Sequence, residues 1–288
     1  MKKTSALLVL LLAIGFIFSS CAGNPDPVDD PVETSQSQTQ TQASPPVLGV
    51  RLSSRYFSPD GDGVDDTLTI SLTCNSDVEI RSWSFEVFEP LVSNQVFFQW
   101  SGQGRPPASL NWDGKNSSGE LVQSASDYTY TFKATNVQGG ASEARGLIEI
   151  DVLITRDGDL LRVQVPSILF GPNIGDFSGV TRDITAANDY VLRRIATTLN
   201  KFSSYQIRVE GHANPTAPTL AAREREHTLE LIPLSEQRAR TVMEYLITLG
   251  VARGRLSSFG IGGSRTIVPY EDHPNWWKNR RVEFILVK

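Results

Sequence analysis

The sequence predicts two folded domains, an all-β sandwich of antiparallel strands followed by an α+β sandwich in the order β-α-β-α-β-β. Three observations lead to this prediction. Short apolar–polar alternations, separated by Gly, Pro, Asn and Asp, run through residues 48–152. After residue 153, helix-spaced apolar residues occur at 184–202 and 235–249, between strand-like segments. About 240 residues follow the N-terminal segments, a length typical of two domains.

The N-terminus has the pattern of an export signal. Lys2 and Lys3 precede an apolar run and then small residues before Cys21. The run of about 13 residues is too short to cross roughly 30 Å of hydrocarbon. A cysteine directly after small residues resembles a bacterial lipoprotein signal, although Phe18 stands where such signals usually carry Leu. This resemblance implies removal of residues 1–20 and lipid on Cys21; a plain secretory signal with a chance cysteine is the alternative.

Residues 21–47 are rich in Pro, Asp, Ser, Thr and Gln. Such a segment cannot bury enough apolar surface to offset its ordering entropy, so we predict a disordered tether. The formal net charge of -5 and the absence of a basic face exclude a phosphate-tracking surface. We therefore expect no nucleic-acid partner.

The first folded domain spans residues 48–152. Its clearest alternating segments are 68–72, 83–88, 96–100, 128–134 and 147–152. The motifs F-S-P-D-G-D-G at 57–63, W-D-G-K at 112–115 and Y-x-Y-x-F at 128–132 resemble the FlgD-like immunoglobulin-type module of bacterial surface and secreted proteins. The resemblance implies a spacer or a module that contacts other envelope proteins, and it implies no catalysis.

The loop that opens this domain is dense in carboxylates. Asp60, Asp62 and Asp65, followed by Asp66, offer oxygen ligands that suit calcium. The position at which an EF-hand has its bidentate Glu is Ser71. The alternative is a set of turns in which Asp side chains accept backbone amides and Gly supplies positive φ. A weak calcium site at these aspartates is the one cofactor or metal that the sequence suggests.

The second folded domain spans residues 153–288. Segments 160–165, 167–170, 205–210, 256–260 and 281–287 are predicted strands. Helix spacing covers residues 184–202, and Ser235 is the expected N-cap of a helix that runs to Leu249 and ends at Gly250.

Three ordered motifs in this domain carry a family resemblance. They are V-E-G-H-A-N at 209–214, L-S-E-Q-R-A at 234–239 and N-R-R-V-E at 279–283. This set resembles the OmpA-like peptidoglycan-binding domain of OmpA, Pal and MotB proteins, whose pattern runs G-H-T-D, N-x-x-L-S-x-x-R-A and N-R-R-V. The resemblance implies an α+β sandwich that binds the stem peptide of peptidoglycan without catalysing a reaction.

The resemblance also implies a set of binding residues. In the family, the Asp of the first motif takes the ligand ammonium and the Arg of the second takes its carboxylate. The corresponding positions here are Asn214 and Arg238, and Asn279 and Arg280 match the element that borders the ligand. A guanidinium near a helix start suits bidentate carboxylate binding, supported by the free amides and dipole there.

Two departures from the family pattern concern this pocket. Asn214 lacks the full charge of Asp, which predicts a contact that is weaker by about tenfold, tuned to a different stem residue, or lost. The segment between Asn214 and Leu234 is longer than in the family, and Leu231 replaces its Asn. Strong helix formers at 220–231 predict a short inserted helix. It either covers the pocket or supplies contacts from Arg223 or Arg225; for these arginines a solvated helix face is the alternative.

The sequence therefore predicts a non-catalytic lipoprotein of the outer membrane that faces the periplasm. Its partners would be the bilayer, through the acyl group on Cys21, and peptidoglycan, through Arg238 and its neighbours. One alternative is a scaffold whose OmpA-like domain has lost wall binding. Another is a cell-wall hydrolase using Glu210, His212, Asp183 or His273, whose spacing fits no metal motif.

Overall fold

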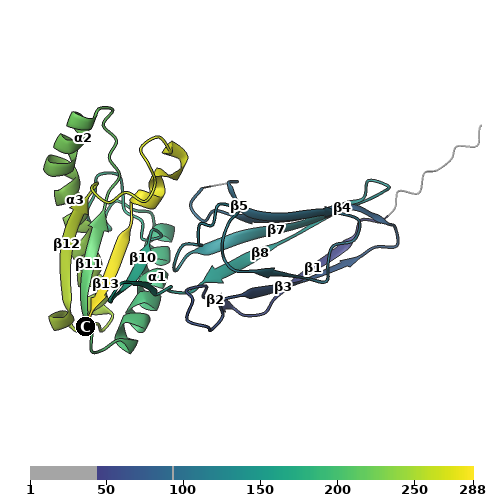
Figure 1. The fold of residues 1–288 in the computed structure, drawn as a ribbon, viewed down its shortest axis with the longest axis horizontal. Helices are drawn as coiled ribbons and strands as arrows, with labels where there is room; N and C mark the ends of the chain where they lie inside the picture. Colours follow the sequence, from purple (N-terminus) through teal and green to yellow (C-terminus); the bar gives the residue numbers. More distant parts are fainter. Residues whose placement is uncertain (1–43, 93) are drawn as a thin grey trace, which may run out of the picture. The chain divides into compact units, whose positions relative to one another are not determined.

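The computed structural model describes residues 44–92 and 94–288 of the chain. The predicted signal, Cys21 and the tether up to residue 43 lie outside this range. Within it, the N-terminal strands form a three-stranded sheet in the order β1-β3-β6 and a five-stranded sheet in the order β2-β8-β7-β4-β5 (Figure 1). The strands are β1 Val47–Leu52, β2 Tyr56–Phe57, β3 Leu68–Asn75, β4 Ile80–Phe88, β5 Val96–Gln103, β6 Ser109–Trp112, β7 Asp127–Asn136 and β8 Ala141–Ile150.

The core of these two sheets follows from strand alternation. Every second residue of β3 is buried, from Leu68 to Cys74, because successive side chains point to opposite faces. Trp112 is only 2% exposed and its ring contacts Phe57, so it is a core residue. The prediction of purely antiparallel pairing is wrong for β2, which pairs in parallel with β8 because the chain crosses from β1 to the edge of the second sheet.

The C-terminal strands form one five-stranded sheet in the order β12-β11-β13-β10-β9. The strands are β9 Thr155–Asp157, β10 Leu160–Val165, β11 Gln206–His212, β12 Leu256–Gly262 and β13 Val282–Val287. The helices are α1 Arg182–Lys201, α2 Leu220–Glu226, the π-helical turn η1 His227–Leu231, α3 Ile232–Thr248 and the 3-10 turns η2 Arg253–Arg255 and η3 His273–Asn279. From β10 onward the predicted order β-α-β-α-β-β is confirmed, and β9 adds an edge strand.

The two long helices share one hydrophobic core with the sheet. The apolar stripe of α1, which includes Leu192 and Ile195, and that of α3, which includes Leu246, pack against Val209 and Phe284 of the sheet. Gly211 on β11 permits this close approach, since an added Cβ would lie 2.0 Å from the carbonyl oxygen of Ser235. The alternate residues of β10, β11 and β13 then point to the other face of the sheet.

Two local predictions for this region are wrong. Residues 167–170 are irregular, since β10 ends at Val165 and Pro166 follows it. Ser235 is inside a helix and caps nothing, because α2, η1 and α3 run on without a break from Leu220. The predicted helix in the inserted segment is confirmed, but it extends α3 instead of standing apart. Gly250, at φ 91°, ends α3 as expected.

The described residues, 44–92 and 94–288, group into one compact unit. The cores described above interlock near the predicted boundary at 152/153: Ala125 and Val152 pack into the C-terminal core, and Leu153 packs into the N-terminal one. The boundary therefore stays a prediction. Across the described ranges, none of the helices is both long enough and apolar enough to traverse a bilayer.

Candidate functional site

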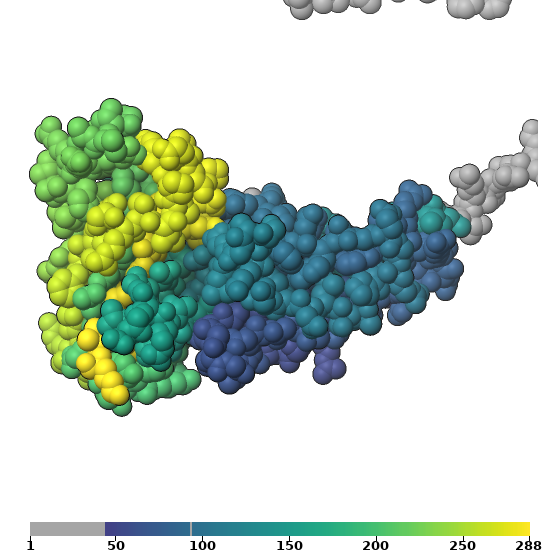
Figure 2. All heavy atoms as spheres, in the orientation of Figure 1, coloured from purple at the N-terminus to yellow at the C-terminus, as the bar shows by residue number. Residues whose placement is uncertain are grey.

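A pocket of about 670 Å³ lies where the loop after β10, the end of β11, the inserted helix and the end of η3 meet. We call it the arginine pocket. Its polar and charged lining residues are Asn173, His212, Asn214, Thr216, Glu226, Glu230, Arg238, Arg280 and Arg281. Segments far apart in the sequence, α2 in green and the yellow stretch before β13, lie side by side around this region (Figure 2).

Arg238 is the central cation of the arginine pocket. Its side chain is buried, its Nε donates to the carbonyl of Ile174 at 3.0 Å, and its Nη2 donates to the carbonyl of Gly171 at 3.2 Å. The guanidinium also lies 5.1 Å from the ring centroid of Phe170. These contacts fix the group but leave Nη1 without a partner in the described residues. No carboxylate there forms an ion pair with it, so a buried charge is left for a ligand to neutralise.

Arg280 adds a second cation at the rim. It is exposed, and among the described residues it too has no carboxylate partner within ion-pair distance. Burial, and then the positive charge of Arg280, lower the pKa of Arg238, while partial burial lowers the pKa of Arg280. Two like charges that repel each other in one pocket favour an anion between them.

Arg281 is not available for binding. Its guanidinium is buried and pairs with Glu283, with Nε at 2.7 Å and Nη2 at 2.6 Å from Oε1. The adjacent arginines, which lie between η3 and β13, therefore differ: Arg280 lines the pocket without an ion pair among the described residues, whereas Arg281 pairs with Glu283.

The two asparagines predicted to bind ligand contact each other. Asn214 Oδ1 accepts a 2.7 Å hydrogen bond from Asn279 Nδ2, and Asn214 Nδ2 donates to the carbonyl of Pro215. Asn214 lines the arginine pocket with part of its amide still unused. Asn279 does not line it. Its Oδ1 accepts from the backbone amides of Ile267 and Val268 and its Nδ2 also donates to the carbonyl of Val268, so Asn279 links Asn214 to the neighbouring loop. In the arginine pocket Asn279 therefore supports Asn214 instead of facing a ligand, and its predicted contact with a ligand stays a prediction.

The helix-terminus argument for Arg238 is also corrected. The amides that precede Arg238 are bonded within the continuous helix from Leu220, so no free helix N-terminus faces the pocket. The guanidinium is therefore the only positive charge that Arg238 and its helix present to the pocket. The sequence pattern placed it near a helix start because the inserted segment was expected to form a separate element.

Comparisons with known proteins match the part of the chain that contains the arginine pocket. Residues 177–280 match the sequence model of the OmpA family. The C-terminal part of this chain is an OmpA-like domain.

Individual relatives show how far the similarity extends. A peptidoglycan-associated lipoprotein of Mesorhizobium japonicum is 34% identical over 116 residues, which are 39% of this chain and 64% of that protein. The probable lipoprotein YiaD of Escherichia coli is 30% identical over 135 residues, 47% of this chain and 55% of YiaD. The chain thus spans less than two thirds of these relatives. The crystal structure of the periplasmic domain of Helicobacter pylori MotB is 26% identical, covering 47% of this chain and 78% of that one, with a TM-score of 0.37.

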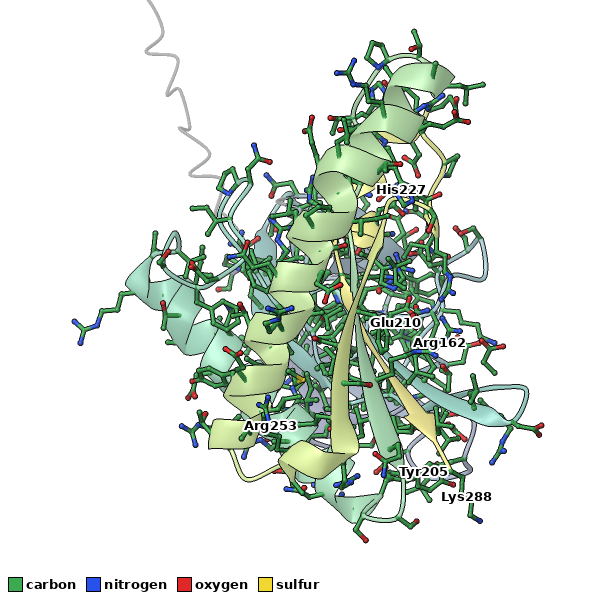
Figure 3. The ribbon with its side chains drawn as sticks, turned by 90° about the vertical axis from the view of Figure 1, so that its left-hand side faces the viewer. Arg162, Tyr205, Glu210, His227, Arg253 and Lys288 are labelled. Atoms are coloured by element: carbon green, nitrogen blue, oxygen red, sulfur yellow. The ribbon has the colours of Figure 1, made fainter. Side chains whose placement is uncertain are left out.

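The sheet face opposite the helices of the OmpA-like domain carries a buried charge network. Glu210 and Arg162 lie on this face, away from α3 (Figure 3). Glu283 accepts from Arg162 at 2.6 Å and from Arg281, and Glu210 accepts from Arg265 at 3.1 Å. These pairs satisfy both buried carboxylates.

His212 lies within this network and could complete a three-residue metal site with Glu210 and Glu283, whose ligand atoms fall within 4.8 Å of one another. The chemistry of the set does not fit a cation, because arginines already occupy the carboxylates. Burial, and then the charges of Arg281, Arg265 and Arg162, lower the pKa of His212 to about 3. Asp183 and His273, the other members of the hydrolase hypothesis, are not part of this cluster.

The acidic loop of the N-terminal sheets brings together Asp60, Asp62 and Asp66, not Asp65. Asp66 accepts the amides of Gly61 and Gly63, both at 2.7 Å, and Asp62 accepts the amide of Val64. Asp65, at φ 54°, is not part of this cluster. The carboxylates that lie together therefore include Asp66 in place of the predicted Asp65, and the calcium site itself stays a prediction. The observed hydrogen bonds are those of the alternative, a carboxylate-capped turn.

Sequence reasoning missed two acidic residues of the arginine pocket. Glu226, Glu230, Leu234 and Arg238 follow one another in steps of four along the continuous helix, and all of them line the pocket. This spacing was visible in the sequence. A predicted helix start at Ser235 separates these acids from the helix of Arg238, so the pattern does not bring them together. The arginines considered instead lie elsewhere: Arg223 lies over the ring of Tyr270 at 4.0 Å, and Arg225 is exposed.

Proposed function

We propose that this chain is a non-catalytic envelope lipoprotein that tethers the outer membrane to the cell wall. In this proposal, Cys21 carries the lipid, the OmpA-like domain binds the stem peptide of peptidoglycan without a covalent bond, and the protein faces the periplasm. The N-terminal sheets act as a spacer that can contact other envelope proteins. The names of the relatives, which include peptidoglycan-associated lipoproteins, support the choice of wall polymer.

The observation that carries the proposal is the unpaired, buried guanidinium of Arg238 in an open pocket. A ligand carboxylate there would replace lost hydration with two charge-assisted hydrogen bonds from Nη1 and Nη2, since Nε is held by Ile174. Arg280 would add charge at the rim and guide an anionic group toward the pocket. Stem peptides of peptidoglycan carry such carboxylates.

The test is sedimentation of the full chain, purified in detergent, with isolated peptidoglycan sacculi. We expect Arg238→Ala to weaken binding by at least roughly tenfold, since one charged hydrogen bond is worth about 1.5–3 kcal/mol. Arg240→Ala is the matched control, because Arg240 lies two residues further on the same helix, is exposed and pairs with Glu236. Arg280→Ala changes an exposed position, so the fold should be retained, and it should also weaken binding. This variant tests the pocket even if Arg238→Ala misfolds.

A specific observation favours a second candidate function. Asn214 replaces the family's Asp, and its amide is bonded to Asn279 and Pro215, so this wall of the pocket offers a ligand no negative charge of its own. The missing charge at this position favours a scaffold that contacts other proteins and does not bind the wall. Failure of the unsubstituted chain to sediment with sacculi would refute the tether and favour the scaffold.

A further inference from the structure

The arginine pocket contains charges of both signs that are not paired with each other. Arg238 and Arg280 supply the positive charges, and Glu226 and Glu230 supply the negative ones. Among the described residues, no nitrogen of these arginines lies within 4.0 Å of either carboxylate. Because solvent screens exposed charges, these separated groups attract each other only weakly. Held apart around one cavity, they suit a ligand that carries both a carboxylate and an ammonium group.

The two glutamates have different roles. Glu226 accepts hydrogen bonds from the amide and hydroxyl of Thr216 and from the amide of Ala217, at 2.7–3.1 Å. Burial opposes ionisation of this carboxyl, but these hydrogen bonds lower its pKa overall. Glu226 therefore fixes the loop that follows Asn214. Glu230 is exposed and has no hydrogen-bond or ion-pair partner in the described part of the chain, so its carboxylate is available to a ligand.

The helix sets the spacing between the ligand-binding charges. Glu230 and Arg238 are eight residues apart on one continuous helix, which places their Cα atoms about 12 Å apart along its axis. Both side chains line the same cavity of about 670 Å³, with Leu234 between them on the helix. A ligand of roughly the size of one amino acid with a long side chain can therefore bridge the two groups.

We propose that Glu230 binds the ammonium group of the ligand whose carboxylate binds Arg238. This inference rests on the proposed function and names the residue that replaces the negative charge missing at position 214. The pocket then recognises a zwitterionic amino-acid unit, and the inserted helix is a determinant of ligand specificity. The insertion supplies this acid, because Glu230 lies in η1, which together with α2 extends α3 at its N-terminal end.

The test compares two probes with the full chain in detergent. The first is a purified stem peptide that ends in a diamino acid with a free side-chain amine, and the second is the same peptide with that amine acetylated. We expect Glu230→Gln to weaken binding of the free-amine peptide by roughly tenfold, since a neutral acceptor replaces a charged one. Binding of the acetylated peptide should not change in this variant. Glu244→Gln is the matched control, because Glu244 is exposed on α3 outside the pocket.

The outcomes separate this inference from the proposed function. Equal affinities of Glu230→Gln and the unsubstituted chain for the free-amine peptide, with Arg238→Ala still defective, would overturn only the role of Glu230. An equal loss of both peptides in Glu230→Gln would also overturn it, because the residue would then act through pocket shape. If the unsubstituted chain binds neither peptide nor sacculi, the proposed function fails and the inference fails with it.

Discussion

Stability of this protein should fall between pH 7 and pH 5 because of one buried histidine. His212 is 1% exposed, and its Nε2 lies 3.7 Å from Glu283 and 3.9 Å from Glu210. Burial, and then the charges of Arg281, Arg265 and Arg162, lower its pKa from 6.5 to about 3. Neither ring nitrogen makes a well-formed hydrogen bond, although the backbone of Arg265 lies near enough to favour the protonated ring slightly. The folded protein therefore keeps this imidazole neutral at pH 5.

The direction of this change in stability follows from how many protons the folded and unfolded states bind at each pH. Below pH 6.5 the unfolded chain binds a proton at His212 that the folded protein excludes, so protonation favours unfolding. The stabilisation relative to the unfolded state is fully present above pH 6.5 and is lost progressively as the pH falls toward 3. The loss between pH 7 and pH 5 is about 2 kcal/mol. The same loss of about 2 kcal/mol results for a His212 pKa of about 4 in the folded protein, because pH 5 still lies above that value.

The assay is urea unfolding at pH 7 and pH 5, followed by tryptophan fluorescence, for the unsubstituted chain and for His212→Gln. Other groups titrate equally in both proteins, so the difference between their pH sensitivities isolates His212. We expect His212→Gln to lose about 2 kcal/mol less stability over this pH interval than the unsubstituted chain. His273→Gln, at an exposed histidine, is the control and should behave like the unsubstituted chain. Equal pH sensitivities of the His212 variant and the unsubstituted chain would refute the reasoning.

Two further predictions concern packing and anchoring. Gly211→Ala should destabilise the fold by about 1–3 kcal/mol, since its Cβ would meet the Ser235 carbonyl, whereas Gly254→Ala, with open space around it, should change little in the same urea assay. An unchanged unfolding midpoint for Gly211→Ala would contradict the close approach of α3. Cys21→Ala should abolish incorporation of a labelled fatty acid and release the protein from membranes, while Cys74→Ala keeps both properties because Cys74 is buried in β3. Labelling that persists in Cys21→Ala would exclude that thiol as the attachment site.

Several elements could be predicted from the sequence because their signals are local. Alternation in residues 68–74 gave β3, and the apolar stripe from Val191 to Leu199 gave α1. Gly250 marked the end of α3 by its freedom to adopt positive φ. The α+β order of the OmpA-like domain followed from placing these elements in sequence.

Other features depended on contacts that no local pattern reports. Ser235 has the chemistry of an N-cap, yet its hydroxyl donates to Ile232 and accepts from Gly262, because the inserted segment continues the helix upstream. Asn279 was assigned to the ligand by its motif, but the structure gives its hydrogen bonds to the loop at 267–268 and to Asn214. In each case a polar side chain had several possible partners, and packing selected among them.

The sequence by itself determined the residue types of the candidate site and the elements that hold them. It contains Arg238 and Arg280, it lacks an acid at position 214, and it places strong helix formers at 220–231. Only the tertiary structure decided which charges remain unpaired. Arg281 is neutralised by Glu283 and Arg238 is not, while Glu226 is bonded to its loop and Glu230 is free for a ligand within the described chain. The physical reason is that a side chain's charge is available only where the fold leaves it without a partner, and the partners come from distant parts of the chain.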